Sequence, residues 1–257
     1  YMDRGYLDFD IENTTVSISE TKKNVYIAII IDEGNKYIFG DIQISGKFYP
    51  LKEESIFQND IKTIKGEVFS RKLLNQSTES INQELGNYGY AFSNVNPIPD
   101  VDKNNLTVGF NYFIEPGKKV YVRRISFMGN EKTQDKVLRR EMRQFESSYY
   151  DKEKIDQSSR RLKRTQYFEG VDIKTVSVPG ISDQVDLTVA VKEKNTGSVK
   201  LGAGASSDEG LVGSFSVTQA NFLGTGNTVS ATINTSSVNT IYQLNHIDPY
   251  FTLDGIS

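Results

Sequence analysis

Few residues in this sequence could carry acid–base, thiol or metal chemistry. The sequence contains no cysteine, which excludes a thiolate metal site, a disulfide and a cysteine nucleophile. Its single histidine, His246, cannot build a histidine-rich metal site or a pair of relays. No carboxylate pair stands in a recognisable acid–base context, and no catalytic triad spacing is present. The sequence therefore predicts a protein that is not an enzyme and that needs no metal and no cofactor.

One glycine-rich stretch has the spacing of a phosphate-binding loop, with Gly202, Gly204 and Ser207 in the order G-x-G-x-x-S. A dinucleotide site requires a strand before this loop and a helix after it. The next residues, Asp208-Glu209-Gly210, are typical of a turn. We therefore interpret the stretch as part of a strand and expect no nucleotide there.

Basic residues are concentrated between residues 118 and 164, where 15 Lys and Arg face seven Asp and Glu. A solvated helical face is the ordinary explanation of such a run. The sharper hypothesis is a docking surface, because arginine forms bidentate pairs with acidic partners or lipid head groups. The region lacks a Gly-x-x-Gly helix turn and stacked strand aromatics, so we expect no nucleic-acid partner.

Charge almost disappears after residue 195. Of the 63 Lys, Arg, Asp and Glu in the chain, only five lie in residues 195–257, whereas eight of the 20 glycines do. Apolar and small polar residues alternate there, as in Val229-Ser230-Ala231-Thr232-Ile233, which predicts about four antiparallel strands with one apolar face. A soluble sandwich and a transmembrane barrel both fit this pattern. The missing charge favours the barrel, but four strands cannot close one, so we expect an incomplete barrel.

The first 194 residues contain an internal repeat. Ile31-Asp32-Glu33-Gly34 and Ile114-Glu115-Pro116-Gly117 are offset by 83 residues, as are Gly46 and Gly129. Each unit has the order strand, helix, helix, strand, strand, which makes the chain an α+β protein. The sequence begins at Tyr1 without a signal-peptide core, and we interpret it as a piece of a longer chain.

Each unit has predicted elements. In the first they are strands at 37–45, 92–98 and 105–114, a helix at 51–64 with Ile56, Phe57, Ile61 and Ile64 inward, and a helix at 70–88 capped by Ser70 with Leu74, Ile81, Leu85 and Tyr88 on one face. In the second they are strands at 120–127, 171–178 and 184–193 and helices at 133–144 and 151–166, capped by Thr133 and Asp151. Residues 1–34 are predicted to be the end of an earlier unit, with strands near 7–18 and 25–31.

Several segments together carry a resemblance to a known family. They are Tyr121-Val122-Arg123-Arg124-Ile125 with Gly129-Asn130, Val137-Leu138-Arg139-Arg140-Glu141-Met142-Arg143-Gln144, Val178-Pro179-Gly180, Asp183-Gln184-Val185-Asp186, Val191 to Ser198, Asn221-Phe222-Leu223-Gly224-Thr225-Gly226 and Pro249-Tyr250-Phe251. Over essentially its whole length the chain resembles the polypeptide-transport-associated (POTRA) repeats and first barrel strands of BamA-type outer-membrane protein assembly factors. The family's Val-Arg-Gly-Phe barrel loop is absent from the sequence.

The resemblance implies a division of the chain and a place in the cell. Residues 1–34 would be the C-terminal part of one POTRA unit, 35–116 and 117–195 two further units, and 196–257 the first strands of a truncated transmembrane β-barrel. The barrel would lie in the bacterial outer membrane and the POTRA units in the periplasm. The implied partners are unfolded outer-membrane proteins, outer-membrane lipid, and BamD-like and other assembly-complex lipoproteins.

The resemblance also implies residue roles. Glu146, with Arg139 and Arg140, would contact the lipoprotein, so Glu146→Lys is expected to weaken that complex while the domain stays folded. Unfolded substrates would pair with strand edges at Ser198, Val199, Lys200, Leu201, Gly202 and Ala203, and at Phe92 and Val95. Pro97 and Pro99 place the 92–98 strand at a sheet edge, either as a docking site or as a block against aggregation.

Two rival functions belong to other classes. One is a two-partner-secretion-type pore or related translocation barrel, which would export one dedicated protein. The other is a soluble enzyme with a β-sandwich tail, which the sequence disfavours because it lacks catalytic residues.

Overall fold

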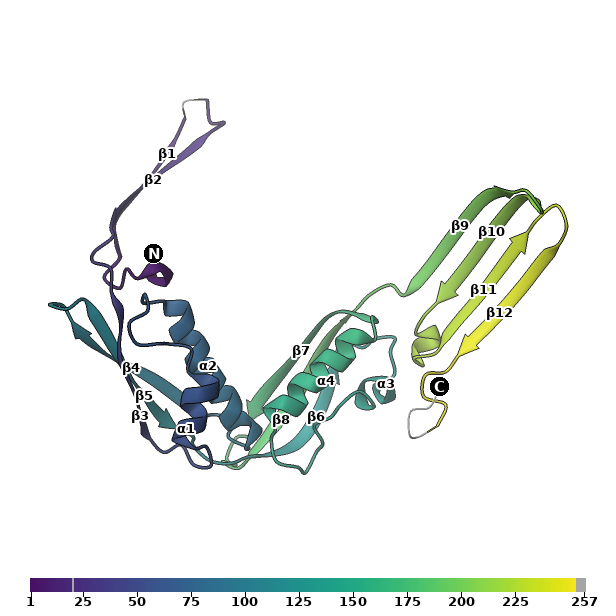
Figure 1. The fold of residues 1–257 in the computed structure, drawn as a ribbon. Helices are drawn as coiled ribbons and strands as arrows, with labels where there is room; N and C mark the ends of the chain where they lie inside the picture. The colour runs from purple at the N-terminus through teal and green to yellow at the C-terminus, as the bar shows by residue number, and fades with distance from the viewer. Residues whose placement is uncertain (20, 253–257) are drawn as a thin grey trace. The chain divides into compact units, whose positions relative to one another are not determined.

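A computed structural model describes residues 1–19 and 21–252 of the chain. It divides into two compact units, Tyr1–Lys119 and Val120–Ser257. Each unit contains one three-stranded mixed sheet with helices packed on it (Figure 1). Each also contains one antiparallel sheet, which has two strands in the first unit and four in the second. No helix among the described residues is long and apolar enough to cross a membrane.

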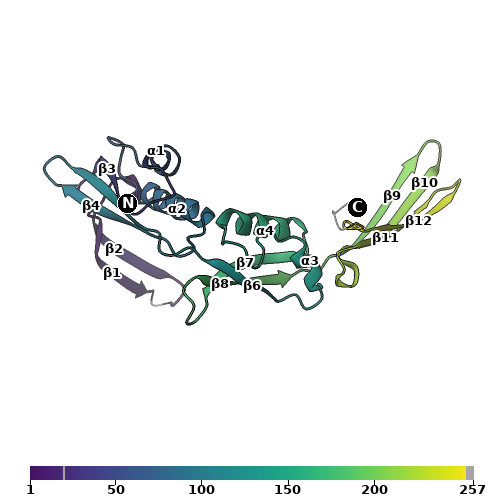
Figure 2. The same cartoon turned by 90° about the horizontal axis from the view of Figure 1, so that it is seen from below.

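The first repeat is built on a mixed sheet with the strand order β3-β5-β4. Strand β3 (Ile38–Gly46) runs parallel to β5 (Thr107–Glu115), and β4 (Asn94–Asp102) runs antiparallel to it. Helix α2 (Arg71–Asn87) packs over one face of this sheet (Figure 2). The core between them contains aromatic and aliphatic side chains of both layers, including Phe39, Phe69, Phe110, Tyr112, Ile81 and Leu85.

The second repeat has the same plan, with the strand order β6-β8-β7. Strand β6 (Tyr121–Met128) is parallel to β8 (Gln184–Glu193), and β7 (Phe168–Ser177) is antiparallel to it. Helix α4 (Lys152–Arg164) packs against this sheet, and a short helix α3 (Asp135–Arg139) precedes it. The order strand, helix, helix, strand, strand is thus confirmed in both repeats.

The two long helices begin where the sequence predicted. The Ser70 side chain accepts a hydrogen bond from the Leu73 N–H at the start of α2, and the Asp151 side chain accepts one from the Lys154 N–H at the start of α4. Tyr88 was predicted to lie on the buried face of α2. That was wrong, because α2 ends at Asn87 and the Tyr88 side chain is exposed.

The first helix of each repeat is much shorter than predicted. Residues 51–64 form only α1 (Glu53–Ser55) and a π turn, η2 (Ile56–Asp60), and Phe57 and Ile64 are exposed instead of inward. After this turn the Lys62 N–H donates to the hydroxyl of the buried Ser77, at 2.8 Å. In the second repeat the Arg143 N–H donates to Ser158, also at 2.8 Å, four residues after α3 ends. In both repeats a serine of the second helix thus binds the backbone that follows the first helix.

Thr133 does not cap a helix. Helix α3 starts two residues later, with Gln134 at the N-cap and no side-chain cap bond, and it ends at Arg139 rather than at residue 144. The Thr133 hydroxyl instead accepts a hydrogen bond from Asn221 Nδ2 at 2.8 Å, and its N–H donates to Glu193 at 2.7 Å. The Thr133 hydroxyl therefore binds Asn221, which is distant in the sequence, and does not cap the helix.

Residues 1–34 form a two-stranded antiparallel hairpin, β1 (Asp10–Ile18) with β2 (Val25–Asp32), after a 3₁₀ turn, η1 (Met2–Arg4). Gly5, at φ 104°, lets the chain approach the first repeat, where the Tyr37 N–H donates to the Gly5 carbonyl at 2.8 Å. The strands agree with the prediction for this segment.

Residues after 196 form an antiparallel meander with the strand order β12-β11-β10-β9. The strands are β9 (Gly197–Ser206), β10 (Gly210–Gln219), β11 (Thr228–Thr235) and β12 (Thr240–Ile247), with a 3₁₀ turn, η3 (Phe222–Gly224), between β10 and β11. Directly paired residues share a face of a sheet. The pairing aligns Leu201, Phe215, Ile233 and Tyr242 in one row.

The same pairing makes the meander two-faced. Val199, Val217, Ala231 and Leu244 form a second row on the apolar face, and Lys200, Ser216, Thr232 and Gln243 form a row on the other face. Ala231 and Ile233 are exposed, so the apolar face is not the inside of a compact core shared with the repeats. Antiparallel strands are confirmed. The last five residues of the 196–257 segment lie outside the described residues.

Candidate functional site

The predicted pairing residues Ser198 to Ala203 all lie on β9, one of the two edge strands of the described meander. β9 pairs with β10 along its whole length, from Gly197 opposite Gln219 to Ser206 opposite Gly210. All ten of its residues are exposed. An edge strand carries a row of backbone N–H and C=O groups that can pair with another strand. The geometry of β9 therefore suits strand addition.

The second predicted edge, β4, is less open. It is the edge strand of the first repeat's sheet and runs without a break through Pro97 and Pro99, which pair with Tyr112 and Phe110. Prolines at alternate positions fit a strand whose missing N–H groups face away from the sheet. Two donors are then absent from the outward edge, which favours the blocking role over the docking role.

The two candidate residues of this region are in different environments. Val95 lies on β4 opposite Ile114, and its side chain is 4% exposed in the core. Phe92 lies in the turn before β4 and is exposed. Only Val95 is therefore placed to pair through its backbone. Substrate pairing at either residue stays a prediction.

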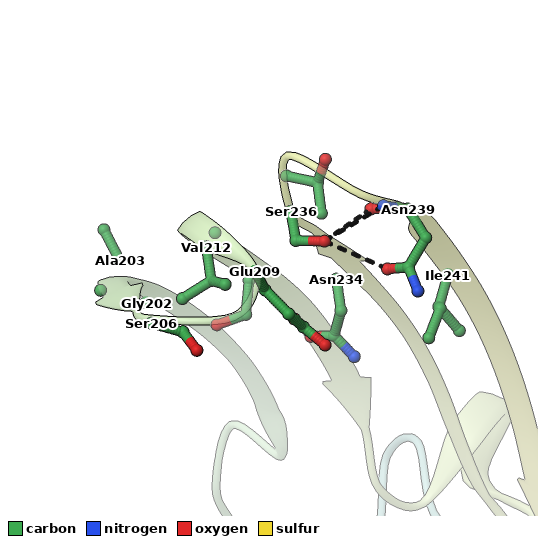
Figure 3. A pocket seen from close by; sticks show the side chains of 13 residues that line it. Gly202, Ala203, Ser206, Glu209, Val212, Asn234, Ser236, Asn239 and Ile241 are labelled. Atoms are coloured by element: carbon green, nitrogen blue, oxygen red, sulfur yellow. Dashed lines mark hydrogen bonds between the residues drawn. The ribbon is translucent and has the colours of Figure 1, made fainter.

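The polar face of the meander forms an open hollow of about 580 Å³ near its turns (Figure 3). Its lining includes Ser206, Glu209, Asn234, Ser236 and Asn239, and Ser236 hydrogen-bonds to Asn239. These small polar groups offer hydration rather than a reactive centre. Nowhere in residues 1–19 and 21–252 do three metal-ligating side chains come together.

The structure divides the three residues predicted to bind a lipoprotein. Glu146 and Arg139 are together, with Arg139 Nη1 3.5 Å from Glu146 Oε1, and both side chains are about half exposed. Arg140 points elsewhere: its guanidinium lies 4.1 Å from the centre of the Tyr250 ring. Only 19% of the Arg140 side chain is exposed, so it is poorly placed to meet a partner.

Arg140 belongs to a buried charged cluster that the sequence did not reveal. Glu141, 6% exposed, lies 2.8 Å from Arg161 Nη2 and 3.8 Å from Arg140 Nε. Arg161 Nη2 also donates to the Tyr250 hydroxyl at 2.8 Å. Burial and the neighbouring Glu141 carboxylate raise the pKa of the Tyr250 hydroxyl. One carboxylate thus serves two arginines, and the cluster joins the second repeat to the chain after β12.

The turn after β10 also docks on the second repeat. The Gln134 N–H donates to the Gly224 carbonyl at 2.9 Å, and the Tyr167 hydroxyl donates to the Gly226 carbonyl at 3.0 Å. Asn221 Oδ1 accepts from the Gly226 N–H. The segments Asn221–Gly226 and Pro249-Tyr250-Phe251, which carried the resemblance, therefore include residues that contact the repeat. Arg161 and Tyr250 lie 89 residues apart in the chain, so no local sequence pattern indicated their contact.

A family model and several curated relatives match this chain. The POTRA family model, described as "Surface antigen variable number repeat", matches residues 37–117 and 120–194. The chain is 36% identical over 258 residues to the outer membrane protein assembly factor BamA of Neisseria meningitidis serogroup B, covering 100% of this chain and 32% of the relative. It is 31% identical over 251 residues to BamA of Buchnera aphidicola, covering 98% of this chain and 40% of the relative.

Solved structures agree with these sequence matches. The crystal structure of BamA from Haemophilus ducreyi lacking POTRA domains 1–3 has a TM-score of 0.73 at 35% identity, covering 85% of this chain and 41% of that one. Haemophilus influenzae BamA POTRA3–5 has a TM-score of 0.70 at 30% identity, covering 75% of each.

The two mixed-sheet repeats and the family match define the class of protein: this chain belongs to the POTRA family. The curated relatives named above are BamA outer membrane protein assembly factors, and the chain spans 32% and 40% of their lengths. The predicted family is therefore confirmed. The POTRA-type α+β fold is confirmed as well. The described strands β9 to β12 form an open sheet, and their place in an incomplete transmembrane barrel stays a prediction.

Proposed function

We propose that this chain is part of an outer-membrane protein assembly factor. Residues 1–34 are the C-terminal part of one periplasmic POTRA unit, 35–116 and 117–195 are two further units, and 196–257 begin its membrane-embedded β-barrel. The relatives are named as assembly factors, which supports the role. The unusual composition of the meander supports the membrane location, because a strand wall in lipid needs an apolar outer face and tolerates small polar residues on the other.

The proposal rests on the meander, which has one apolar and one polar face and begins with the edge strand β9. Its apolar rows, such as Leu201, Phe215, Ile233 and Tyr242, are in register across all four strands. In a hydrocarbon setting an unpaired backbone group costs several kcal/mol, because no water replaces the missing partner. An incoming strand that pairs with β9 removes this cost. Backbone pairing and apolar burial drive the process, and no nucleotide is required.

The partners in this proposal are unfolded outer-membrane proteins, lipid, and BamD-like and other assembly-complex lipoproteins, but no nucleic acid. Glu146 and Arg139 are exposed and adjacent, which suits contact with a charged partner surface. Arg140 would act only through the buried cluster that it shares with Glu141 and Tyr250.

Proline substitution on β9 tests the strand-pairing role. In the full-length protein we expect Val199→Pro or Leu201→Pro to impair outer-membrane protein assembly, because each removes a backbone donor and distorts the strand. Ser207→Pro, in the turn after β9, is the matched control and should complement normally. Full complementation by both strand variants would refute the pairing role of β9.

Substrate range distinguishes this role from export of one dedicated protein. A photo-crosslinker at Leu201 should capture many different outer-membrane proteins. Capture of a single protein would support the secretion pore instead.

A further inference from the structure

The outer edge of β6 is closed over its first half by the segment that leads into α4. The Val122 N–H donates to the Ser148 carbonyl at 2.9 Å, and the Ser147 N–H donates to the Val122 carbonyl at 2.7 Å. The Tyr150 N–H donates to the Val120 carbonyl at 3.0 Å. This edge therefore already accepts antiparallel backbone from its own chain.

Beyond Val122, two side chains instead of backbone groups bind to the outer edge of β6. The Ile125 N–H donates to Glu146 Oε1 at 2.8 Å, and Arg139 Nη2 donates to the Ile125 carbonyl at 3.4 Å. The Arg139 guanidinium also lies 5.1 Å from the centre of the Phe127 ring. Glu146 and Arg139, which we call the edge latch, thus occupy both backbone groups that Ile125 would offer to an added strand.

The first repeat has the same edge with a different residue at the latch position. The Phe39 N–H donates to the Glu67 carbonyl and the Gly66 N–H donates to the Phe39 carbonyl, both at 2.8 Å. Gly66 and Ser147 both have positive φ, 89° and 62°, so the two turns correspond. Lys65 precedes Gly66 as Glu146 precedes Ser147. A lysine has no acceptor for an edge N–H, and Lys65 is paired with Asp41 instead.

We propose that the edge latch controls a second strand-addition site, at Ile125–Met128 on β6. When a cation of a partner binds Glu146, the Ile125 N–H becomes available to an extended segment of an unfolded polypeptide. This rests on the proposed function, since unfolded strands are the substrate there.

The surroundings of the latch favour an apolar strand as the occupant. Phe145, which precedes Glu146 in the chain, is 64% exposed, and Met128, at the end of β6, is 59% exposed. Alternating apolar side chains are what an outer-membrane strand carries, as β9 does with Val199 and Leu201. The lipoprotein contact and substrate capture are then coupled through one carboxylate.

Hydrogen exchange of the Ile125 amide in the full chain tests the latch directly. Glu146→Ala should speed exchange about tenfold or more, because the amide loses its acceptor. Glu146→Gln keeps a side-chain oxygen and should preserve slow exchange. Lys65→Ala, the matched change in the first repeat, should leave Ile125 unaffected. Unchanged exchange in Glu146→Ala would overturn the latch.

Crosslinking tests the strand addition. A photo-crosslinker replaces Met128, and the probe is a peptide with the sequence of residues 197–206. We expect Glu146→Ala to raise the yield at least about threefold over Glu146→Gln, as expected when a backbone donor is freed. Fast exchange without increased capture would overturn the strand-addition site. Capture at Leu201, measured in parallel, reports separately on the proposed function: its loss there would sink that function and leave the exchange result standing.

Discussion

At the scale of single residues, carboxylates of the second repeat hold distant backbone segments together by accepting hydrogen bonds from their N–H groups. Glu193, at the end of β8, accepts from the Thr133 N–H at 2.7 Å and from the Lys132 N–H at 3.1 Å. Burial by itself would raise the pKa of Glu193, but these hydrogen bonds outweigh it and lower the pKa. In the sequence, Glu193 appeared only within the segment Val191 to Ser198, which contributes to the family resemblance. Its partners lie about 60 residues away, so no local pattern could identify them.

The lowered pKa of Glu193 gives a pH-dependent contribution to stability. A depressed folded-state pKa stabilises the fold above the unfolded value, and this contribution is lost as pH falls through the folded value. We expect Glu193→Gln to lower the free energy of unfolding by about 1–2 kcal/mol at neutral pH. The difference from the parent should shrink below about pH 4. Urea unfolding at several pH values checks this, and a pH-independent difference would contradict it.

Gly224 illustrates a backbone requirement at a contact between the meander turn and the repeat. Its φ is +73°, and a Cβ there would lie far inside contact distance of the Lys132 carbonyl. Gly180 has a similar φ of +78° but open space around it, so it isolates the cost of the conformation alone. We expect Gly180→Ala to cost about 1–2 kcal/mol and Gly224→Ala to cost clearly more. Equal losses in denaturant unfolding would show that the turn is not docked against Lys132.

At the scale of elements, local rules predicted what local forces determine. Ser70 and Asp151 begin their helices because their side chains cap N–H groups within three residues, and alternation placed the strands of the meander. The first helix of each repeat was predicted too long. The segment after it binds instead to Ser77 or Ser158, whose hydroxyls accept N–H groups 15 residues earlier in the chain. The resemblance implied one site for Glu146, Arg139 and Arg140, but the structure separates them because Arg139 and Arg140 contact different neighbours.

Because the two repeats correspond, a hydrogen bond of the second repeat can be introduced at the edge of β3 in the first repeat. Lys65→Glu places a carboxylate where the second repeat has Glu146, next to Ile42 at the position of Ile125. We expect slower exchange of the Ile42 amide, by about fivefold, as for one added hydrogen bond. Lys65→Met removes the same charge without adding an acceptor and should not slow exchange. Equal rates in the two variants would show that the carboxylate does not reach the edge.

At the scale of the whole molecule, one chain combines repeats that have charged surfaces with a sheet that has almost no charge. The repeats bury their cores between helices and sheets, whereas the meander leaves rows of apolar side chains exposed. A contiguous exposed apolar surface is typical of a site that contacts protein or membrane. Composition alone predicted this contrast, because only five of the 63 charged residues follow residue 195. The pairing register, which aligns the apolar rows, required the structure.

Two neighbouring residues of β12 test which face meets lipid. Leu244 shares the apolar face with Ala231, and Asn245 shares the polar face with Ser230. In the full-length protein we expect Leu244→Arg to weaken stability in lipid vesicles by about 2–4 kcal/mol, the cost of a cation near the bilayer midplane. Asn245→Arg should cost little. A larger loss for Asn245→Arg would reverse the assignment of the faces.

The duplicated edge with Lys65 in one copy and Glu146 in the other supplies an internal standard. Exchange of the Ile42 and Ile125 amides can be measured in one sample of the same chain. A ligand that acts on Glu146 changes exchange at Ile125 and not at Ile42, so the first repeat provides the reference for the second.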